Sequence, residues 1–381
     1  MRSIAIFYAS EGTGHRAAAE ALRDWFLLQN PGGRVICRDV LDYLPLWLHK
    51  LVSDGYLFMA RYAPWAWGWF YWGSDKPSFQ AAAFERIHAA LCRRYLPKAE
   101  REIEAIKAEA AVFTHYFGAA HLARRNIGNF PVYYVNTDFI SHRFQRDKAF
   151  RASFTASPKA VAQYEEDGME PVFDTGIPVS PKFASLSSKA AARTKLGLDT
   201  RRTVIVVSGG GIGAGSVLSV TDSLARHAEW DIVVICGKNA SLYRRLSARF
   251  RGIRSVRIER FVSNMEDYYG SADLCIMKPG GLSLSEALAA GLPLLLMDPI
   301  PGQEQLNMDY LCGLGAAAAL QDAARADIEA QKLLLDHKKL TDMKLAAAKL
   351  SRPKAGLSIL EKIEETSHKA FAPDPPKIST Y

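Results

Sequence analysis

The sequence predicts an α/β protein built from two Rossmann-like domains that face each other across a cleft. Each half of the chain contains a short apolar run, then a glycine-rich loop, then a helical segment, which is how a Rossmann-like sheet begins. The 381 residues suggest two domains of ordinary size. An apolar content of 49% is enough to fill two cores.

The first domain is predicted to span residues 1–178. It opens with a buried strand over 3–9, a glycine-containing loop over 10–15 and an amphipathic helix over 16–28. Further strands are expected over residues 35–40, 111–114, 132–135, 153–157 and 172–175.

The second domain is predicted to span residues 179–350. Its first strand, over 203–208, runs into a glycine-rich loop in which Gly210 and Gly211 let the backbone approach a phosphate or a sugar. Further strands are expected over residues 232–236 and 258–262. Beyond the domain we expect a helix over 351–368 and a flexible, Pro-rich tail over 369–381.

The most informative stretch follows a buried strand over residues 272–277. Pro279 ends this strand, Gly280 and Gly281 allow a tight loop, and a helix then starts. The N-terminus of such a helix presents unpaired N–H groups and a positive dipole end, which suits an anionic phosphate.

Two further features lie in the same stretch. Ser283 and Glu286 have the spacing of a capping box at the start of the helix. A second buried strand over 294–297 then leads into a Pro-stiffened loop, with Gln303 and Glu304 as polar side chains at its tip.

Three motifs within this stretch carry a family resemblance: KPGG at 278–281, SEAL at 285–288 and GQExxN at 302–307. Together they resemble the nucleotide-sugar site of the family, similar to glycosyltransferase family 28, that contains monogalactosyldiacylglycerol synthases and processive diacylglycerol glucosyltransferases. The resemblance covers about residues 4–350. It implies the GT-B architecture, with the acceptor on the first domain, the donor on the second, and a last helix that crosses back to the first.

The resemblance also implies roles on the donor side. The backbone of Phe261 and Val262 is expected to meet the uracil, Glu286 the ribose hydroxyls, and Gln303 and Glu304 the sugar hydroxyls. Glu286 would instead bond backbone N–H groups if it acts as a capping residue. The full expected donor set is Gly14, Gly210, Gly211, Phe261, Val262, Gly280, Gly281, Leu282, Ser283, Glu286, Gln303, Glu304 and the loop-supporting Asn307.

On the acceptor side, His15 matches the histidine that ends the family's glycine loop, although Glu11 and Thr13 are bulkier than the usual glycines. The resemblance makes His15 catalytic; without it, a helix-start histidine bonded to backbone is the simpler interpretation.

The family's Thr-Asp pair, followed by a histidine four residues later, matches Thr137, Asp138 and His142. Gln145 stands where the family usually has Trp, which bears on acceptor identity. Asp138 could also be a helix N-cap.

An aromatic run contains Trp65, Trp67 and Trp69. Residues two apart do not share a helix face, so some of these side chains must be exposed or lie in an irregular loop. Exposed tryptophans favour a membrane interface, whereas the alternative is an aromatic patch buried against the sheet.

The net charge of +8 is compatible with an anionic membrane surface, and we find no nucleic-acid motif and no run of five or six like charges. Five scattered cysteines, a strand directly after Met1 and the absence of a membrane-spanning apolar run predict a cytoplasmic protein that is peripheral on the inner face of the cell membrane.

The resulting hypothesis is an inverting glycosyltransferase that moves glucose or galactose from a UDP-sugar to the hydroxyl of diacylglycerol, with His15 or Asp138 as the base. The chain has no Asp-x-Asp motif, so no metal cofactor is expected and helix N-termini would stabilise the leaving group. The alternatives are another lipid or a soluble acceptor, a UDP-N-acetylglucosamine 2-epimerase, and a non-enzymatic lipid-binding protein.

Overall fold

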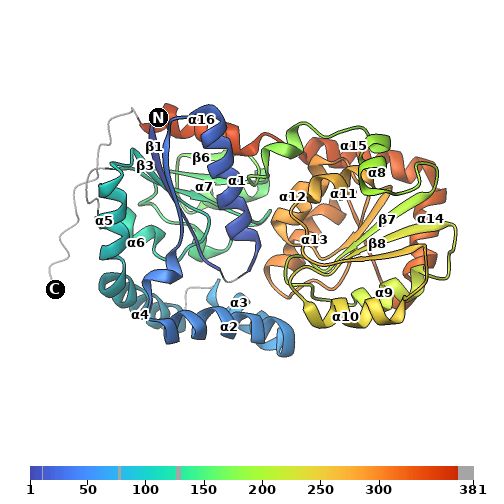
Figure 1. The fold of residues 1–381 in the computed structure, drawn as a ribbon. Coiled ribbons are helices and arrows are strands. Elements are labelled where there is room, and N and C mark those ends of the chain that lie inside the picture. Colours follow the sequence, from blue (N-terminus) through green and yellow to red (C-terminus); the bar gives the residue numbers. More distant parts are fainter. Residues whose placement is uncertain (11, 76–78, 126–129, 368–381) are drawn as a thin grey trace.

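The computed structural model describes residues 1–381 except 11, 76–78, 126–129 and 368–381, so the predicted tail over 369–381 lies outside the described residues. Two α/β domains lie side by side (Figure 1). Each contains a parallel six-stranded sheet, in the order β2-β1-β3-β4-β5-β6 in the first domain and β12-β11-β10-β7-β8-β9 in the second. The predicted fold class is confirmed.

The first sheet consists of β1 (Ser3–Tyr8), β2 (Arg34–Asp39), β3 (Ala110–Phe113), β4 (Val132–Val135), β5 (Ala152–Thr155) and β6 (Val172–Asp174). Its helices are α1 (Gly14–Gln29), α2 (Leu46–Tyr62), α3 (Pro64–Ser74), α4 (Phe79–Tyr95), α5 (Pro97–Ala105), α6 (Ala119–Arg125) and α7 (Pro158–Glu166). The strands β3, β4 and β5 are buried throughout because helices cover both faces of the parallel sheet.

The second sheet consists of β7 (Thr203–Ser208), β8 (Trp230–Ile235), β9 (Val256–Glu259), β10 (Leu274–Met277), β11 (Leu294–Leu296) and β12 (Ala318–Ala319). Its helices are α8 (Lys189–Leu196), α9 (Val217–Leu224), α10 (Ala240–Arg249), α11 (Met265–Ser271), α12 (Gly281–Ala289), α13 (Gln303–Gly313), α14 (Ala326–Leu335) and α15 (His337–Leu350). Figure 1 shows β7 and β8 inside this layer of helices.

The last helix, α16 (Ala355–Ser367), returns to the first domain. Its apolar face, with Ile359 and Ile363, packs into the same core cluster as Ile4 and Leu22. The neighbouring Trp25 donates its indole N–H to the carbonyl oxygen of Val179 at 2.9 Å, so the helix α1 also holds the connection between the domains.

Within the described residues, no helix is both long enough and apolar enough to span a bilayer.

Candidate active site

A cavity of about 520 Å³ lies between the two domains. Most of the predicted site residues line it: Gly14, His15, Trp67, Asp138, His142, Gly210, Gly211, Phe261, Val262, Gly280, Gly281, Leu282, Ser283, Glu286, Gln303 and Glu304. Asn307, Trp65 and Trp69 do not. The carboxyl ends of parallel strands from both sheets therefore meet at one site, as expected for open α/β sheets.

His15 sits in the first turn of α1, where its ring is held by the first domain. Nδ1 lies 2.7 Å from the carbonyl oxygen of Thr114 and 2.9 Å from Oγ1 of Thr137. A carbonyl oxygen can only accept, so Nδ1 carries the proton and Nε2 is the basic nitrogen. The backbone bond of the simpler interpretation is present, and it also gives His15 the tautomer that a general base requires.

Asp138 follows β4 and is joined to the second domain. Nδ2 of Asn307 donates to its Oδ1 at 2.9 Å, while the Asn307 side-chain oxygen accepts from the N–H of Phe139 at 2.9 Å. Burial raises the pKa of the Asp138 carboxyl to about 6, despite the bond from Asn307. Asp138 does not cap a helix, because the short turn of helix after it is capped by His142.

The KPGG and GQExxN motifs meet through an ion pair. Nζ of Lys278 lies 3.1 Å from Oε2 of Glu304, and both side chains are largely buried. The same Glu304 oxygen accepts from the N–H of Ile300 at 2.8 Å. Gln303 and Glu304 are not at a loop tip as predicted: they form the first turn of α13, where Pro301 and Gly302 end the loop one residue earlier.

Replacing Glu304 with Gln should lower kcat/KM by about 10-fold to 1,000-fold, the scale of losing one or two charge-assisted hydrogen bonds to a sugar hydroxyl. Steady-state kinetics and a thermal melt measure this. Asp309→Asn makes the same chemical change on the exposed side of the same helix and should leave turnover intact. Near-normal turnover of the Glu304 variant with an unchanged melt would remove Glu304 from the donor site.

The helix α12 starts earlier than the capping-box spacing predicts. Its N-cap is Gly280 and no side chain caps it, so the Ser283–Glu286 capping box is wrong. A glycine N-cap leaves the N-terminal N–H groups facing the cavity, because no side-chain oxygen occupies them.

The Glu286 side chain does not cap the helix, so it can contact a bound ligand. Burial raises the pKa of its carboxyl to about 8, so near pH 7 it is mostly a protonated acid that can both donate and accept.

The two domains touch at glycines. A Cβ on Gly281 would lie 2.1 Å from the carbonyl oxygen of Thr137, and a Cβ on Gly211 would lie 2.1 Å from Oγ1 of Thr13. Contacts this short leave no room for a side chain. The glycine loops of the second domain therefore close directly onto loops of the first.

The aromatic run forms the helix α3, not an irregular loop. Trp65 and Trp69 are four residues apart on one face and are 77% and 70% exposed. Trp67 points the other way, lines the cavity and donates its indole N–H to Oε1 of Gln303 at 3.3 Å. The helical repeat thus separates Trp67 from the two exposed tryptophans, as the two-residue spacing predicts.

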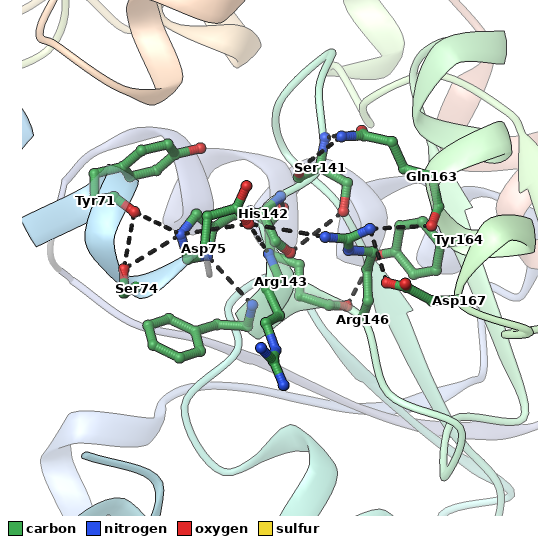
Figure 2. Close-up of polar contacts among 12 residues, drawn as sticks. Tyr71, Ser74, Asp75, Ser141, His142, Arg143, Arg146, Gln163, Tyr164 and Asp167 are labelled. Atoms are coloured by element: carbon green, nitrogen blue, oxygen red, sulfur yellow. Dashed lines mark hydrogen bonds and ion pairs between the residues drawn. The ribbon is translucent and has the colours of Figure 1, made fainter. Parts of the chain in front are cut away.

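His142, in the loop after β4, connects that loop to α3 (Figure 2). Its Nε2 lies 3.1 Å from the carbonyl oxygen of Tyr71, and its Nδ1 accepts from the N–H of Phe144 at 3.2 Å. Burial lowers the pKa of His142, so the ring is neutral at pH 7. With both nitrogens used by backbone, His142 shapes the cavity wall and is not placed as a proton carrier.

Asp75 and Arg146 add further polar contacts between the end of α3 and the loop that contains His142. Asp75 accepts from the N–H of Arg143 at 2.8 Å, and Arg146 lies between Asp75 and Asp167, 2.8 Å from the latter (Figure 2). Gln145, in place of the family aromatic, is buried and accepts from the N–H of His142 at 2.7 Å.

The sequence did not single out two further residues of the cavity wall. The ring of His115 packs edge-on against His15 with centroids 4.8 Å apart. Tyr71 packs on His142 at 4.5 Å and against Gly302. The position of His115 just after a strand could have indicated a place at the edge of the sheet, near the site. The direction of Tyr71 could not be predicted, because it depends on how α3 packs against the second domain.

Comparisons with known proteins agree with this architecture. A family model described as monogalactosyldiacylglycerol (MGDG) synthase matches residues 15–179, and one described as glycosyl transferases group 1 matches residues 195–350. Processive diacylglycerol beta-glucosyltransferase of Bacillus mycoides (strain KBAB4) is 28% identical over 374 residues, which cover 96% of this chain and 94% of the relative.

Two solved structures share the fold at low identity. MurG of Acinetobacter baumannii gives a TM-score of 0.60 at 16% identity, covering 96% of this chain and all of that one. Phytolacca americana UGT2, solved with UDP-2-fluoro-glucose and pterostilbene, gives 0.58 at 12% identity, covering 96% of this chain and all of that one. One family model matches each domain and a relative aligns over nearly the whole chain, so this protein has the GT-B fold of glycosyltransferases and is similar to monogalactosyldiacylglycerol synthases and processive diacylglycerol glucosyltransferases.

Proposed function

We propose that this protein is an inverting transferase that moves glucose or galactose from a UDP-sugar to the hydroxyl of diacylglycerol at an anionic membrane surface. The observation that carries the proposal is the tautomer of His15. Its Nδ1–H is tied to the backbone of Thr114, so Nε2 is the basic nitrogen, and the ring lines a cavity that the KPGG and GQExxN motifs also line. A base on the acceptor side suits single displacement, in which the acceptor hydroxyl loses its proton as it attacks the anomeric carbon.

The donor class is supported by the second domain. The N-terminus of α12 has no side-chain cap and lines the cavity with Gly281, Leu282 and Ser283, a suitable environment for a diphosphate. The solved complex of the plant transferase contains a UDP-sugar analogue. The relative's name supports diacylglycerol as the acceptor.

We expect transfer to be metal-independent. The chain lacks an Asp-x-Asp motif, and the leaving diphosphate would be stabilised by backbone N–H groups and the dipole of α12. Turnover should therefore be unchanged after dialysis against EDTA, measured as product per minute from a labelled UDP-sugar. Activity that disappears with EDTA and returns only with Mg²⁺ or Mn²⁺ would contradict this account of the phosphate site.

The membrane contact is proposed for the exposed face of α2 and α3. Diacylglycerol stays in the bilayer, so the cavity must be brought to its surface. Large apolar side chains are 61% to 77% exposed on these two helices: Leu46, Trp47, Leu51, Phe58, Trp65 and Trp69. Amphipathic aromatic rings of this kind favour the headgroup region.

Replacing Trp65 and Trp69 together with Ala should weaken vesicle binding that persists at high salt, because buried aromatic area is not screened by ions. Co-sedimentation with phosphatidylglycerol-containing vesicles measures this. UDP-sugar binding and the melting temperature should stay unchanged, since both rings face outward. The matched variant Trp67→Ala should do the opposite, keeping vesicle binding and weakening donor binding. A double variant that still pellets fully at high salt would exclude this face.

The proposed function is tested directly by product analysis. The protein is incubated with labelled UDP-glucose or UDP-galactose and diacylglycerol vesicles, and the lipid phase is separated by chromatography. A labelled glycolipid is the expected result. A free epimerised nucleotide sugar, or label only on a soluble acceptor, would overturn the proposal.

A further inference from the structure

The positive charge of this protein is concentrated in one segment of the donor domain. Residues 238–260 contain eight of the 48 Lys and Arg residues but one of the 40 Asp and Glu residues. The segment therefore carries +7 of the chain's net +8, and the rest of the chain is nearly balanced. The cations are Lys238, Arg244, Arg245, Arg249, Arg251, Arg254, Arg257 and Arg260.

All eight side chains are exposed, and few are neutralised. Among the described residues, Arg249 pairs with Asp222 and Arg257 with Glu259, while Arg260 lies over the ring of Tyr243 at 4.6 Å. The other five cations have no ion pair within the part of the chain that the structure describes: Lys238, Arg244, Arg245, Arg251 and Arg254. This is a surface of largely uncompensated charge.

The helix α10, which contains three of these cations and is flanked by the others, does not depend on them for its packing. The helix α10 packs on its sheet through Leu242 and Leu246, which are buried, and its N-terminus is capped by the Asn239 side chain. After the helix, Ile253 is 41% exposed between Arg251 and Arg254. An exposed apolar side chain among cations suits contact with a membrane, which has anionic headgroups above an apolar layer.

The placement of the segment is the second observation. In Figure 1 α10 forms the lower edge of the second domain, and α2 forms the lower edge of the first. The helix α15 lies along the upper edge of the second domain. The helix α10 at the centre of the basic segment thus lies on the same side of the molecule as α2.

We propose that residues 238–260 are a second membrane contact, through which the donor domain binds the phosphate headgroups of anionic lipids. The proposal rests on the proposed function, since diacylglycerol is what brings the protein to a bilayer. Clustered basic side chains at a surface attract anionic lipids over about a Debye length and are screened by salt. The segment is flanked by Gly237 and Phe261, both of which line the cavity, so this contact holds the donor site at the bilayer surface.

The first membrane contact and this one differ in physical character. The face on α2 and α3 is aromatic and lies on the acceptor domain, whereas the segment on α10 is cationic and lies on the donor domain. When both domains bind the same bilayer, the membrane favours the domain arrangement in which the cavity between them is held at the bilayer surface, where the acceptor lies. The charge requirement for anionic lipid then comes from the second domain, not from the tryptophan helix.

The experiment compares two fourfold variants of the full chain. The test variant changes four cations that have no ion pair among the described residues: Arg244→Gln, Arg245→Gln, Arg251→Gln and Arg254→Gln. The control removes the same charge from exposed positions of α14 and α15 in the same domain: Lys332→Gln, Lys339→Gln, Lys344→Gln and Lys349→Gln. Co-sedimentation is measured with phosphatidylcholine vesicles that contain or lack phosphatidylglycerol, at low and high salt.

The test variant should bind phosphatidylglycerol vesicles about 10-fold to 1,000-fold more weakly at low salt, and the control should bind like the unaltered protein. Equal losses in both variants would mean that only net charge matters and would overturn the proposal. So would unchanged vesicle binding with a raised KM for the UDP-sugar, because the segment would then attract the nucleotide, or tighter binding of an RNA oligomer than of vesicles.

Failure of the proposed function looks different. Glycolipid synthesis is assayed separately in neutral detergent micelles that contain diacylglycerol, where both variants should be as active as the unaltered protein. If the unaltered protein makes no glycolipid there, the proposed function fails. The vesicle measurement uses no substrate and still decides the role of the basic segment.

Discussion

Replacing His15 with Asn should lower kcat by about 100-fold to 10,000-fold, the contribution of a positioned general base. Asn keeps an N–H donor close to the place of Nδ1, which now binds the carbonyl oxygen of Thr114 at 2.7 Å. It removes Nε2, the atom that is proposed to accept the proton of the acceptor hydroxyl. Donor binding by calorimetry and the thermal melt should therefore be nearly unchanged while turnover is lost.

Asp138 is the competing base, and a comparison of single variants distinguishes the two. Burial raises the pKa of its carboxyl to about 6, so a reaction that depended on Asp138 as a base would lose rate as the pH falls through 6. We expect Asp138→Asn to be less damaging than His15→Asn, because Asn307 already bonds this carboxylate across the domains. Near-normal kcat in the His15 variant, together with collapse in the Asp138 variant, would assign the base to Asp138.

Replacing Gly281 with Ala should lower kcat/KM at least about 100-fold, the cost of displacing reacting groups by an ångström or more. Ala is a better helix former than Gly, so α12 itself should not suffer. The added Cβ would lie 2.1 Å from the carbonyl oxygen of Thr137 and 3.1 Å from Cα of Asp138, so the second domain could not close onto the first.

The neighbouring glycine provides the control. A Cβ on Gly280 would meet one atom within 4 Å, Oε1 of Glu304 at 3.9 Å, which is ordinary contact. Gly280→Ala should therefore keep most of its activity. Small-angle scattering should show a larger radius of gyration for Gly281→Ala alone. Equal activity of the two variants would mean that domain closure at this point is not required for transfer.

The sheets were predictable because buried parallel strands are continuous apolar runs. Val204 to Val207 and Leu274 to Met277 are buried throughout, as their composition predicts. The positions of the KPGG and GQExxN motifs were also predictable, because a loop that follows a parallel strand lies at the carboxyl edge of the sheet. All of this information is local in the sequence.

The errors arose where a side chain's role depends on another segment. The spacing of Ser283 and Glu286 satisfies a capping box, but the helix already begins at Gly281, which abuts Thr137 of the other domain. The direction of Trp67 depends on contact with Gln303, which is 236 positions away in the chain.

The two sides of the helix α3 differ in how tightly they are packed. Its inner side meets the donor domain at Gly68 against Pro301 and at Tyr71 against Gly302, and meets the acceptor loop at His142. Its outer side, with Trp65 and Trp69, is exposed. Substitutions can therefore accumulate on the outer side without disturbing the donor chemistry, whereas the inner side must change in concert with two distant loops. Under the proposed function, such a helix lets a lineage adapt to bilayers of new composition while keeping one sugar-transfer reaction.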